Sequence, residues 1–410
     1  MTRGKRTWLY AITSSVAIVA ILVASFALFL THGAPAHAAS GGGDGIGTAK
    51  YLTAGAAGTV SPNAITIANW GASFTDPTNG VTYPYSMVGA DPASNSSTTV
   101  PFVIVPLDFT FASAPAGVDP TLAGSSRVAA TIDSPVFNGG ADIGKASKTA
   151  SAAPAGVAPK PRMEQEPGDT TQVGDAFVRA QWNKVGTGYH VLLGAPTVAP
   201  AVSIAVPSNQ GFMLVGSVSH ARIGLMSYSW FSSQLHNLMV SMHISPTVVP
   251  LFLVYDTFLY IQTTSNCCVL GYHGATSSAN GNGQQQINTY MFASYSEPGI
   301  FAPNTGDRFS YIQDIHALSH EVSEWLDDPF VNNAVNPWLT PTAPQYGCTG
   351  DLEVGDPVVG YGFTVTMPSG AAYHPEDEVF FSWFARQSPS ISSAGYYTYL
   401  NNFATVAQGC

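Results

Sequence analysis

The stretch HALSHEVSEWLDD (residues 316–328) predicts a helix with one apolar and one polar face. Apolar residues recur along it at spacings of three and four, as they do on the core-facing side of a helix. These residues are Ile315, Leu318, Val322 and Trp325. Ser310 and Gln313 predict an N-terminal capping box. Pro329 predicts that the helix ends at Asp327, because the residue before a proline is disfavoured in a helix.

The polar face of this helix carries His316, His320, Ser323, Glu324 and Asp327. It contains H-E-x-x-E from His320 onward, a variant of the zinc motif H-E-x-x-H. Residues four apart on a helix are separated by about 6 Å, so one ion reaches two neighbours in the series 316, 320 and 324 but not all three. His320 with Glu324 is the favoured metal-binding pair, because Glu321 then stands where a catalytic base is needed. His316 with His320 is the alternative pair; otherwise His316 and Asp327 support the site.

A third ligand is expected from the acidic loop GCTGDLEVGDP (residues 347–357). It offers Glu353 and Asp356 as metal ligands and Asp351 as a supporting acid. Residues 301–380 hold twelve acidic residues and one basic residue. Such a concentration of carboxylates requires a cation or extensive hydration. The sequence therefore predicts a metal site made by the helix and this loop, with zinc as the expected metal.

Other interpretations stay open. H-E-x-x-E also occurs by chance on solvated acidic helix faces, and oxygen-rich ligation suits calcium or manganese as well as zinc. His273, in CCVLGYHGA, is expected to be a structural histidine. Glu376 and Glu378, in HPEDE, are outlying metal candidates. No G-x-S-x-G elbow, P-loop or dinucleotide fingerprint follows a suitable strand.

The N-terminus predicts export. Three basic residues precede an apolar stretch (8–30), and Ala36-His37-Ala38 forms a small-x-small cleavage site. A signal peptide (1–38) and a secreted mature chain are expected; an uncleaved segment would instead keep the protein at the cell surface. The exported part holds 25 acidic and 11 basic residues, a net charge of −14. This charge argues against nucleic acid or an anionic membrane surface as a partner.

The four cysteines predict disulfides, because an exported chain meets oxidising conditions. They are Cys267, Cys268, Cys348 and Cys410. Three pairings are open. A bridge between the adjacent residues Cys267 and Cys268 would be strained, so we favour bridges from one or both of them to Cys348 and Cys410.

Strand signals and a few helices predict an α+β fold, with a mixed or antiparallel sheet packed on the helix of residues 316–328. Strands are expected at 64–71, 99–111, 126–137, 189–194, 202–207, 249–262, 267–275 and 287–297. Helices are also expected at 173–185 and 229–240. The expected domains are a signal peptide (1–38), a flexible Gly/Ala-rich segment (39–62), a β-rich N-terminal part (63–144), a linker or insertion (145–169) and a metal-binding domain (170–410).

Five features together resemble a group of secreted bacterial proteins with a zincin-like metallopeptidase fold. They are DAFVRAQW (175–182), CCVLGYHG (267–274), SHEVSEWLDDP (319–329), GDLEVGDP (350–357) and Cys410. The layout is also distantly similar to that of the plant phosphate-induced (Exordium-like) proteins. The resemblance covers about residues 100–410, and the segment 145–169 departs from it.

This resemblance implies that His320 and Glu324 are ligands, that Glu321 is the base, and that Glu353 or Asp356 is the downstream acid. The expected function is a secreted metal-dependent hydrolase, a metallopeptidase acting on peptides or proteins. Glu321 would then take a proton from a water activated by the metal. The alternative is a non-catalytic cell-wall-associated or binding protein with a structural cation site.

Overall fold

The computed structural model describes most of the chain beyond its N-terminal segment. The described residues are 60–143, 169–217, 219–264, 267–301, 308–339, 341 and 348–410. The predicted signal peptide and nearly all of the predicted Gly/Ala-rich segment and linker lie outside the described residues. Within the described residues, no helix is both long enough and apolar enough to cross a membrane.

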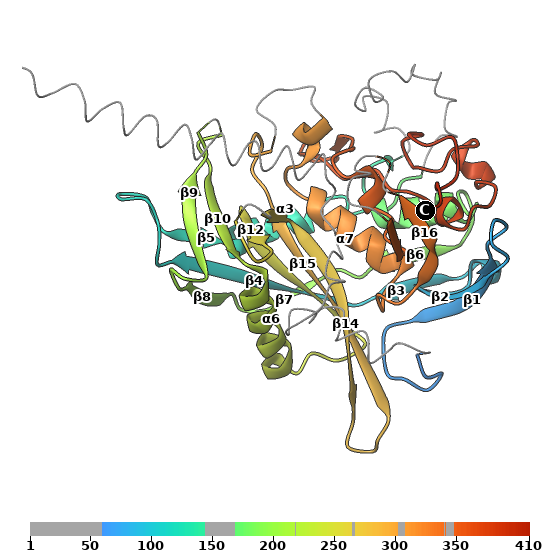
Figure 1. Cartoon of the computed structure of the whole chain (residues 1–410), viewed down its shortest axis with the longest axis horizontal. Helices are drawn as coiled ribbons and strands as arrows, with labels where there is room; N and C mark the ends of the chain where they lie inside the picture. The colour runs from blue at the N-terminus through green and yellow to red at the C-terminus, as the bar shows by residue number, and fades with distance from the viewer. Residues whose placement is uncertain are drawn as a thin grey trace, which may run out of the picture.

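A mixed sheet forms the centre of the molecule (Figure 1). Its strands are β4 Phe102–Phe111, β5 Thr121–Ala123, β7 Thr197–Val198, β8 Val202–Val206, β11 Val249–Tyr255, β14 Gly271–Ala279 and β15 Gln285–Tyr295. They are hydrogen-bonded in the order β14-β15-β11-β4-β5, and β7 and β8 also pair with β4. β11 runs parallel to both of its neighbours, whereas β14 and β5 at the two ends are antiparallel. The apolar run of β11 suits this central position, since both of its faces are covered.

Helices lie on both faces of this sheet. The helices of the described residues are α3 Val128–Ile132, α5 Val173–Gln181, α6 Tyr228–Met242, α7 His316–Asp327 and α8 Phe381–Phe384. α7 packs against β14, β15 and α5. Alternate residues of β11 separate two cores: Leu251 and Leu253 face the core shared with α7, and Phe252 and Val254 face the core shared with α6. The sheet is therefore a middle layer between α7 and α6.

The rest of the described strands form smaller sheets. Four strands pair in the order β13-β12-β10-β9: β13 Cys267–Val269, β12 Thr257–Tyr260, β10 Arg222–Ser227 and β9 Gly211–Val215. Two-stranded pairs are β1 Asn69–Thr75 with β2 Thr82–Val88, β3 Ser97–Val100 with β6 His190–Leu193, β16 Ala334–Leu339 with β17 Cys348–Asp351, and β18 Val365–Thr366 with β19 Ala372–Tyr373. The prediction of an α+β fold is confirmed. The segments 63–144 and 170–410 contribute to one sheet, because β4 pairs with β11.

Two predicted strands differ from the structure: the strand predicted at 249–262 is divided at Asp256 into β11 and β12, which lie in different sheets, and the strand predicted at 126–137 is wrong. Residues 126–137 were expected to be extended, but they contain the end of a 3-10 turn (Gly124–Arg127) and the helix α3. A short apolar run fits either a strand or a helix, and the alanines of this run favour the helix. Gly124 packs against the backbone of β11, where a Cβ would lie 2.2 Å from the carbonyl oxygen of Leu253. Tertiary packing therefore fixes where this turn begins.

The start of α7 also differs from the prediction, whereas its end at Asp327 is confirmed. The helix begins at His316, and Gln313 donates to the backbone oxygen of Ser310 instead of closing a capping box. Asp314 interrupts the predicted helix, since its φ of 40° is left-handed and its backbone exchanges two hydrogen bonds with Ser296 after β15. A tertiary bridge thus overrides the local capping signal.

The disulfides join Cys267 to Cys268 and Cys348 to Cys410. The expectation that one of the adjacent cysteines reaches Cys348 or Cys410 is therefore wrong. Cys267 and Cys268 lie in the four-stranded sheet, packed in a cluster with Phe258. Cys348 lies in β17, where the Cα atom of Cys410 is 6.2 Å away, an ordinary disulfide spacing. The second bridge ties the C-terminus to the strand that leads into the acidic loop.

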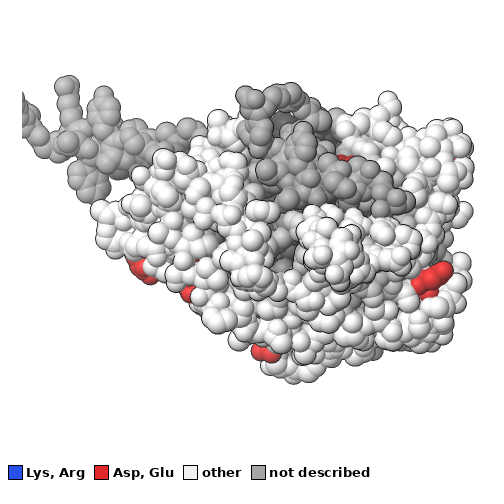
Figure 2. Space-filling view, turned by 90° about the horizontal axis from the view of Figure 1, so that it is seen from below, with Lys and Arg blue, Asp and Glu red and all other residues white. Residues whose placement is uncertain are grey.

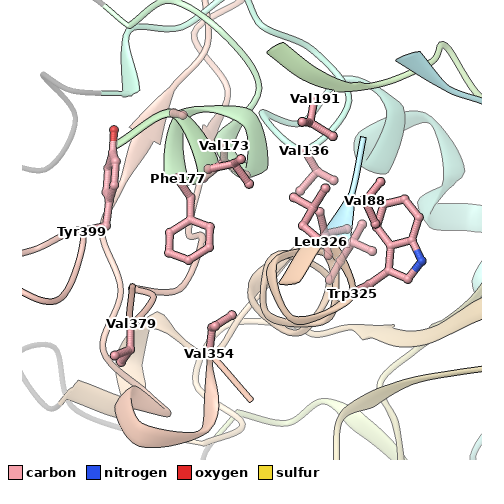
Figure 3. Packing of buried hydrophobic residues seen from close by; sticks show 14 of the residues in the cluster. Val88, Val136, Val173, Phe177, Val191, Trp325, Leu326, Val354, Val379 and Tyr399 are labelled. Atoms are coloured by element: carbon pink, nitrogen blue, oxygen red, sulfur yellow. The ribbon is translucent and has the colours of Figure 1, made fainter. Parts of the chain in front are cut away.

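Both faces of α7 are buried. Its apolar residues enter the main core, where Figure 3 shows Trp325 and Leu326 close to Val88 and Val191. Eleven of its twelve residues are buried, including the polar ones at 316, 319, 321, 323, 324 and 327. The interpretation of its polar side as a solvated acidic face is therefore wrong. Segments from the C-terminal part of the chain cover that side, and Val354 of the acidic loop belongs to the same core.

Candidate metal centre

One side of α7 carries His320, Glu321 and Glu324. One helical turn separates His320 from Glu324, and their Nε2 and Oε1 atoms are 3.1 Å apart. Both glutamates are buried, and the His320 side chain is 14% exposed. A buried carboxylate beside a histidine is balanced either by a proton on the ring or by a metal cation.

The loop after β17 brings Asp356 to this pair. Asp356 begins a 3-10 turn (Asp356–Val358), and its Oδ1 lies 3.9 Å from Nε2 of His320. The backbone N–H of Gly355 donates to Oε1 of Glu324 at 3.3 Å. A Cβ at Gly355 would lie 2.3 Å from Nδ1 of His320, so glycine is what lets the loop come this close. Donor atoms of His320, Glu324 and Asp356 all lie within 4.8 Å of one another, and we call these residues the His320 triad.

Glu376 orients the ring of His320. Nδ1 of His320 donates to Oε2 of Glu376 at 2.5 Å. Because a carboxylate only accepts, a neutral ring then presents the lone pair of Nε2 to the two carboxylates of the triad. Oε1 of Glu376 accepts from the backbone N–H of Gly360 at 3.0 Å and lies 3.3 Å from Nε2 of His316. His316 is thus beside Glu376, one contact away from the His320 triad.

His273 on β14 approaches α7 from the sheet. Its Nδ1 lies 3.5 Å from Oε2 of Glu321 and 3.6 Å from Oε2 of Glu324, while its Nε2 donates to the backbone oxygen of Asp328 at 3.1 Å. Gly271, two residues earlier on the same face of β14, makes room for Glu321; a Cβ there would lie 2.6 Å from Oε1 of Glu321. Sequence reasoning missed His273 as part of this cluster. Gly271 and His273 are two residues apart and therefore lie on the same face of β14. This spacing predicts a contact with Glu321 only if it is already known that β14 packs on α7.

The remaining predicted residues fall into two sets. Glu353 is buried, and it forms with His273 and Glu324 a second group of donor atoms within 4.8 Å, which we call the His273 triad. Asp327 accepts from a glutamine side chain of α5 at 3.0 Å, and Asp351 lies in β17. Among the described residues, neither aspartate belongs to a triad. Asp327 connects two helices, which is a structural contact.

Burial and the neighbouring charges shift the ionisation of these groups. Burial by itself would lower the pKa of His320, but the carboxylates of Glu324 and Glu376 hold it well above its usual range. Burial raises the pKa of Glu321 to about 7, and it would also raise that of Glu324. The pKa of Glu324 is nevertheless lowered, because His320 and His273 both contact it. Glu324 is therefore the carboxylate that both histidines, His320 and His273, stabilise in its ionised form.

The acidic residues of the cluster are inside the protein. The face in Figure 2 shows only a few separate acidic side chains and no dense acidic patch. In the described part of the chain, the ion pairs of this cluster all use histidine as the positive partner. Protons on these histidines or on the carboxylates themselves, or metal cations, therefore balance the buried charge.

No protein-family model, curated protein or solved structure matches the chain. The resemblance drawn from its sequence motifs thus stays a prediction. What the site can bind follows from its donor atoms. Each triad offers one ring nitrogen and two carboxylates, a set that suits zinc or manganese.

Proposed function

We propose that this chain is an exported, zincin-like metal-dependent hydrolase whose cation is held by the His320 triad. One observation carries the proposal: His320 commits Nδ1 to Glu376, and its other nitrogen faces Oε1 of Glu324 at 3.1 Å and Oδ1 of Asp356 at 3.9 Å. A neutral ring would aim a lone pair at two buried carboxylates, which is unfavourable, so either a second proton on the ring or a cation between these groups is needed. A carboxylate that fixes the hydrogen of one ring nitrogen is the usual partner of a metal-binding histidine, and this supports the proposal.

The residues present fit a divalent cation. Three protein ligands leave a coordination position open, as catalytic zinc sites do. A cation bound there would act as a Lewis acid toward a carbonyl group and would make a water molecule more acidic. Mixed nitrogen and oxygen donors favour zinc or manganese, and calcium is less suited because it prefers a full set of oxygen ligands.

Glu321 is the residue we assign to proton transfer. It follows His320 directly on α7, and its Oε2 makes no hydrogen bond within the described residues. A carboxylate oxygen in that state is available to accept a proton from a nucleophilic water and to return it to the leaving group. Gly271 leaves the space in which this side chain lies. Glu376 is a positioning residue, since it orients the His320 ring, and His316 lies beside Glu376.

A structural cation site is the second candidate, and burial is the observation that favours it. The side chains of His320 and Asp356 are only 14% and 16% exposed, and Glu324 is 3% exposed. A site this enclosed can stabilise the contact between α7 and the acidic loop without contacting a substrate. In that case the protein is a non-catalytic binding or wall-associated protein.

Metal analysis combined with one conservative variant separates the two candidates. The purified protein is assayed for bound metal and for hydrolysis of a general protein substrate, beside Glu321→Gln. Glu297→Gln is the matched control, because Glu297 pairs with Arg127 away from the cluster. Bound metal with activity lost in Glu321→Gln alone supports the hydrolase. Metal without activity supports the structural site, and absence of metal after reconstitution with zinc or manganese overturns both.

A further inference from the structure

Glu324 is shared between two groups of potential ligands. Its Oε1 lies 3.1 Å from Nε2 of His320, and its Oε2 lies 3.6 Å from Nδ1 of His273. Its two oxygens therefore face two different histidines, one on its own helix and one on β14. A carboxylate in this position is able to bridge two cations, one on each oxygen.

The ring of His273 is oriented for a ligand in the same way as the ring of His320. Nε2 of His273 is 3.1 Å from the backbone oxygen of Asp328, which can only accept, so Nε2 carries a hydrogen. The other nitrogen, Nδ1, consequently presents either a lone pair or a second proton to the carboxylates around it. Glu353 completes a set of donor atoms that lie within 4.8 Å of one another.

A second observation points to a ligand at this place. Glu321 is 3% exposed, and its Oε2, 3.5 Å from Nδ1 of His273, makes no hydrogen bond in the described part of the chain. A buried carboxylate oxygen without a hydrogen bond is costly unless a cation lies near it. The absence of a side chain at Gly271 brings Glu321 into this position.

We propose that the His273 triad binds a second divalent cation and that Glu324 bridges the two ions. The inference rests on the proposed function, because Glu324 also belongs to the His320 triad. The ligand is zinc or manganese, as the nitrogen and oxygen donors favour. Bridged ions in hydrolases lie about 3.5–4 Å apart and together stabilise the attacking and the leaving oxygen. The centre is then dinuclear, and its buried half contains His273, which was not predicted as a ligand from the sequence.

The competing state is a doubly protonated His273 that forms ion pairs with Glu321 and Glu324. Metal stoichiometry distinguishes it from the proposal. The full chain, stripped with a chelator and reconstituted with Zn²⁺, is expected to retain two ions per chain. His273→Ala and Glu353→Gln are each expected to retain one. His190→Ala, which removes another carboxylate-paired histidine next to Asp175, is expected to retain two.

Manganese supplies a second, spectroscopic readout. Two Mn²⁺ ions bridged by one carboxylate are expected to give an exchange-coupled electron paramagnetic resonance spectrum, and His273→Ala is expected to give the spectrum of a single ion. One zinc per wild-type chain overturns the second site and leaves the proposed function intact. Two uncoupled manganese ions overturn the bridge by Glu324, and two ions retained in His273→Ala overturn the assignment of the second ion to the His273 triad. No bound metal overturns both proposals.

Discussion

α7 and α6 flank opposite faces of the same sheet, and they use their polar residues in opposite ways. Of the fifteen residues of α6, only Phe231 and Leu235 are buried, and its polar side is open to solvent. Eleven of the twelve residues of α7 are buried. Both helices contain a histidine near the middle: His236 of α6 is exposed, and His320 of α7 lies between three carboxylates.

This difference shows that an amphipathic pattern identifies the apolar side of a helix but does not determine whether its polar side is exposed or buried. The polar side of α7 is enclosed by β14, by the acidic loop and by Glu376, all remote from it in sequence. Enclosed polar groups are costly unless they are paired or bind an ion. The polar residues of α7 are therefore the ones that substitutions should affect.

The largest expected effect is that of Glu324→Ala. This change removes the carboxylate that His320 and the buried His273 contact, and loss of one partner from a buried ion pair costs about 3–5 kcal/mol. We expect loss of metal binding and a lower urea midpoint of unfolding. His236→Ala on α6 is the control and should change the stability by less than about 0.5 kcal/mol. Equal losses in the two variants would contradict the contrast between the helices.

Gly355→Ala is expected to have the next largest effect. Its Cβ would lie 2.3 Å from the ring of His320, so the loop or the ring has to move. Overpacking of this kind costs about 1–3 kcal/mol. Gly281→Ala is the matched control, since no atom lies within 4 Å of a Cβ there. Thermal unfolding and zinc titration measure the outcome, and an unchanged zinc affinity in Gly355→Ala would show that the loop does not shape the site.

Glu376→Gln is expected to weaken zinc binding about 10–100-fold, the usual effect of losing the partner that orients a ligand. The amide keeps an acceptor for Gly360 but no longer fixes the hydrogen on Nδ1 of His320. Competition with a chromophoric chelator measures the affinity. Glu297→Gln serves again as the control, and an identical affinity in both variants would remove Glu376 from the site.

The smallest effect concerns a buried carboxylate outside the cluster. Burial raises the pKa of Asp256 to about 7, against the hydrogen bond that it accepts from the backbone N–H of Glu297. A folded-state pKa above the unfolded value destabilises the fold as the pH rises from about 4 to 7. Asp256→Asn stays neutral at every pH, so it should be more stable than the wild-type protein at pH 8 and equally stable at pH 4. Urea unfolding at both pH values checks this, and a gain that is equal at both would refute the ionisation argument.

Much of the fold followed from local patterns. The apolar run of β11, the helices α5 and α6 and the end of α7 at Asp327 were all predicted, because side-chain periodicity and proline act within a few residues. The misassigned segment 126–137 and the late start of α7 share one cause. In each, contacts with a distant strand decided the backbone: Leu253 under Gly124, and Ser296 beside Asp314.

The sequence by itself determined which residues of one helix face the same way, so His320, Glu321 and Glu324 could be grouped from spacing alone. Only the tertiary structure decided that His273 and Glu376 join them, because β14 and the C-terminal segment come together through the packing of the core. Tertiary structure also decided the disulfide partners and the burial of the polar side of α7. The physical reason is the distance along the chain over which each interaction acts. A helical turn fixes residues four apart at about 6 Å through the backbone. Segments that are distant in sequence meet only where burial of apolar surface brings them together.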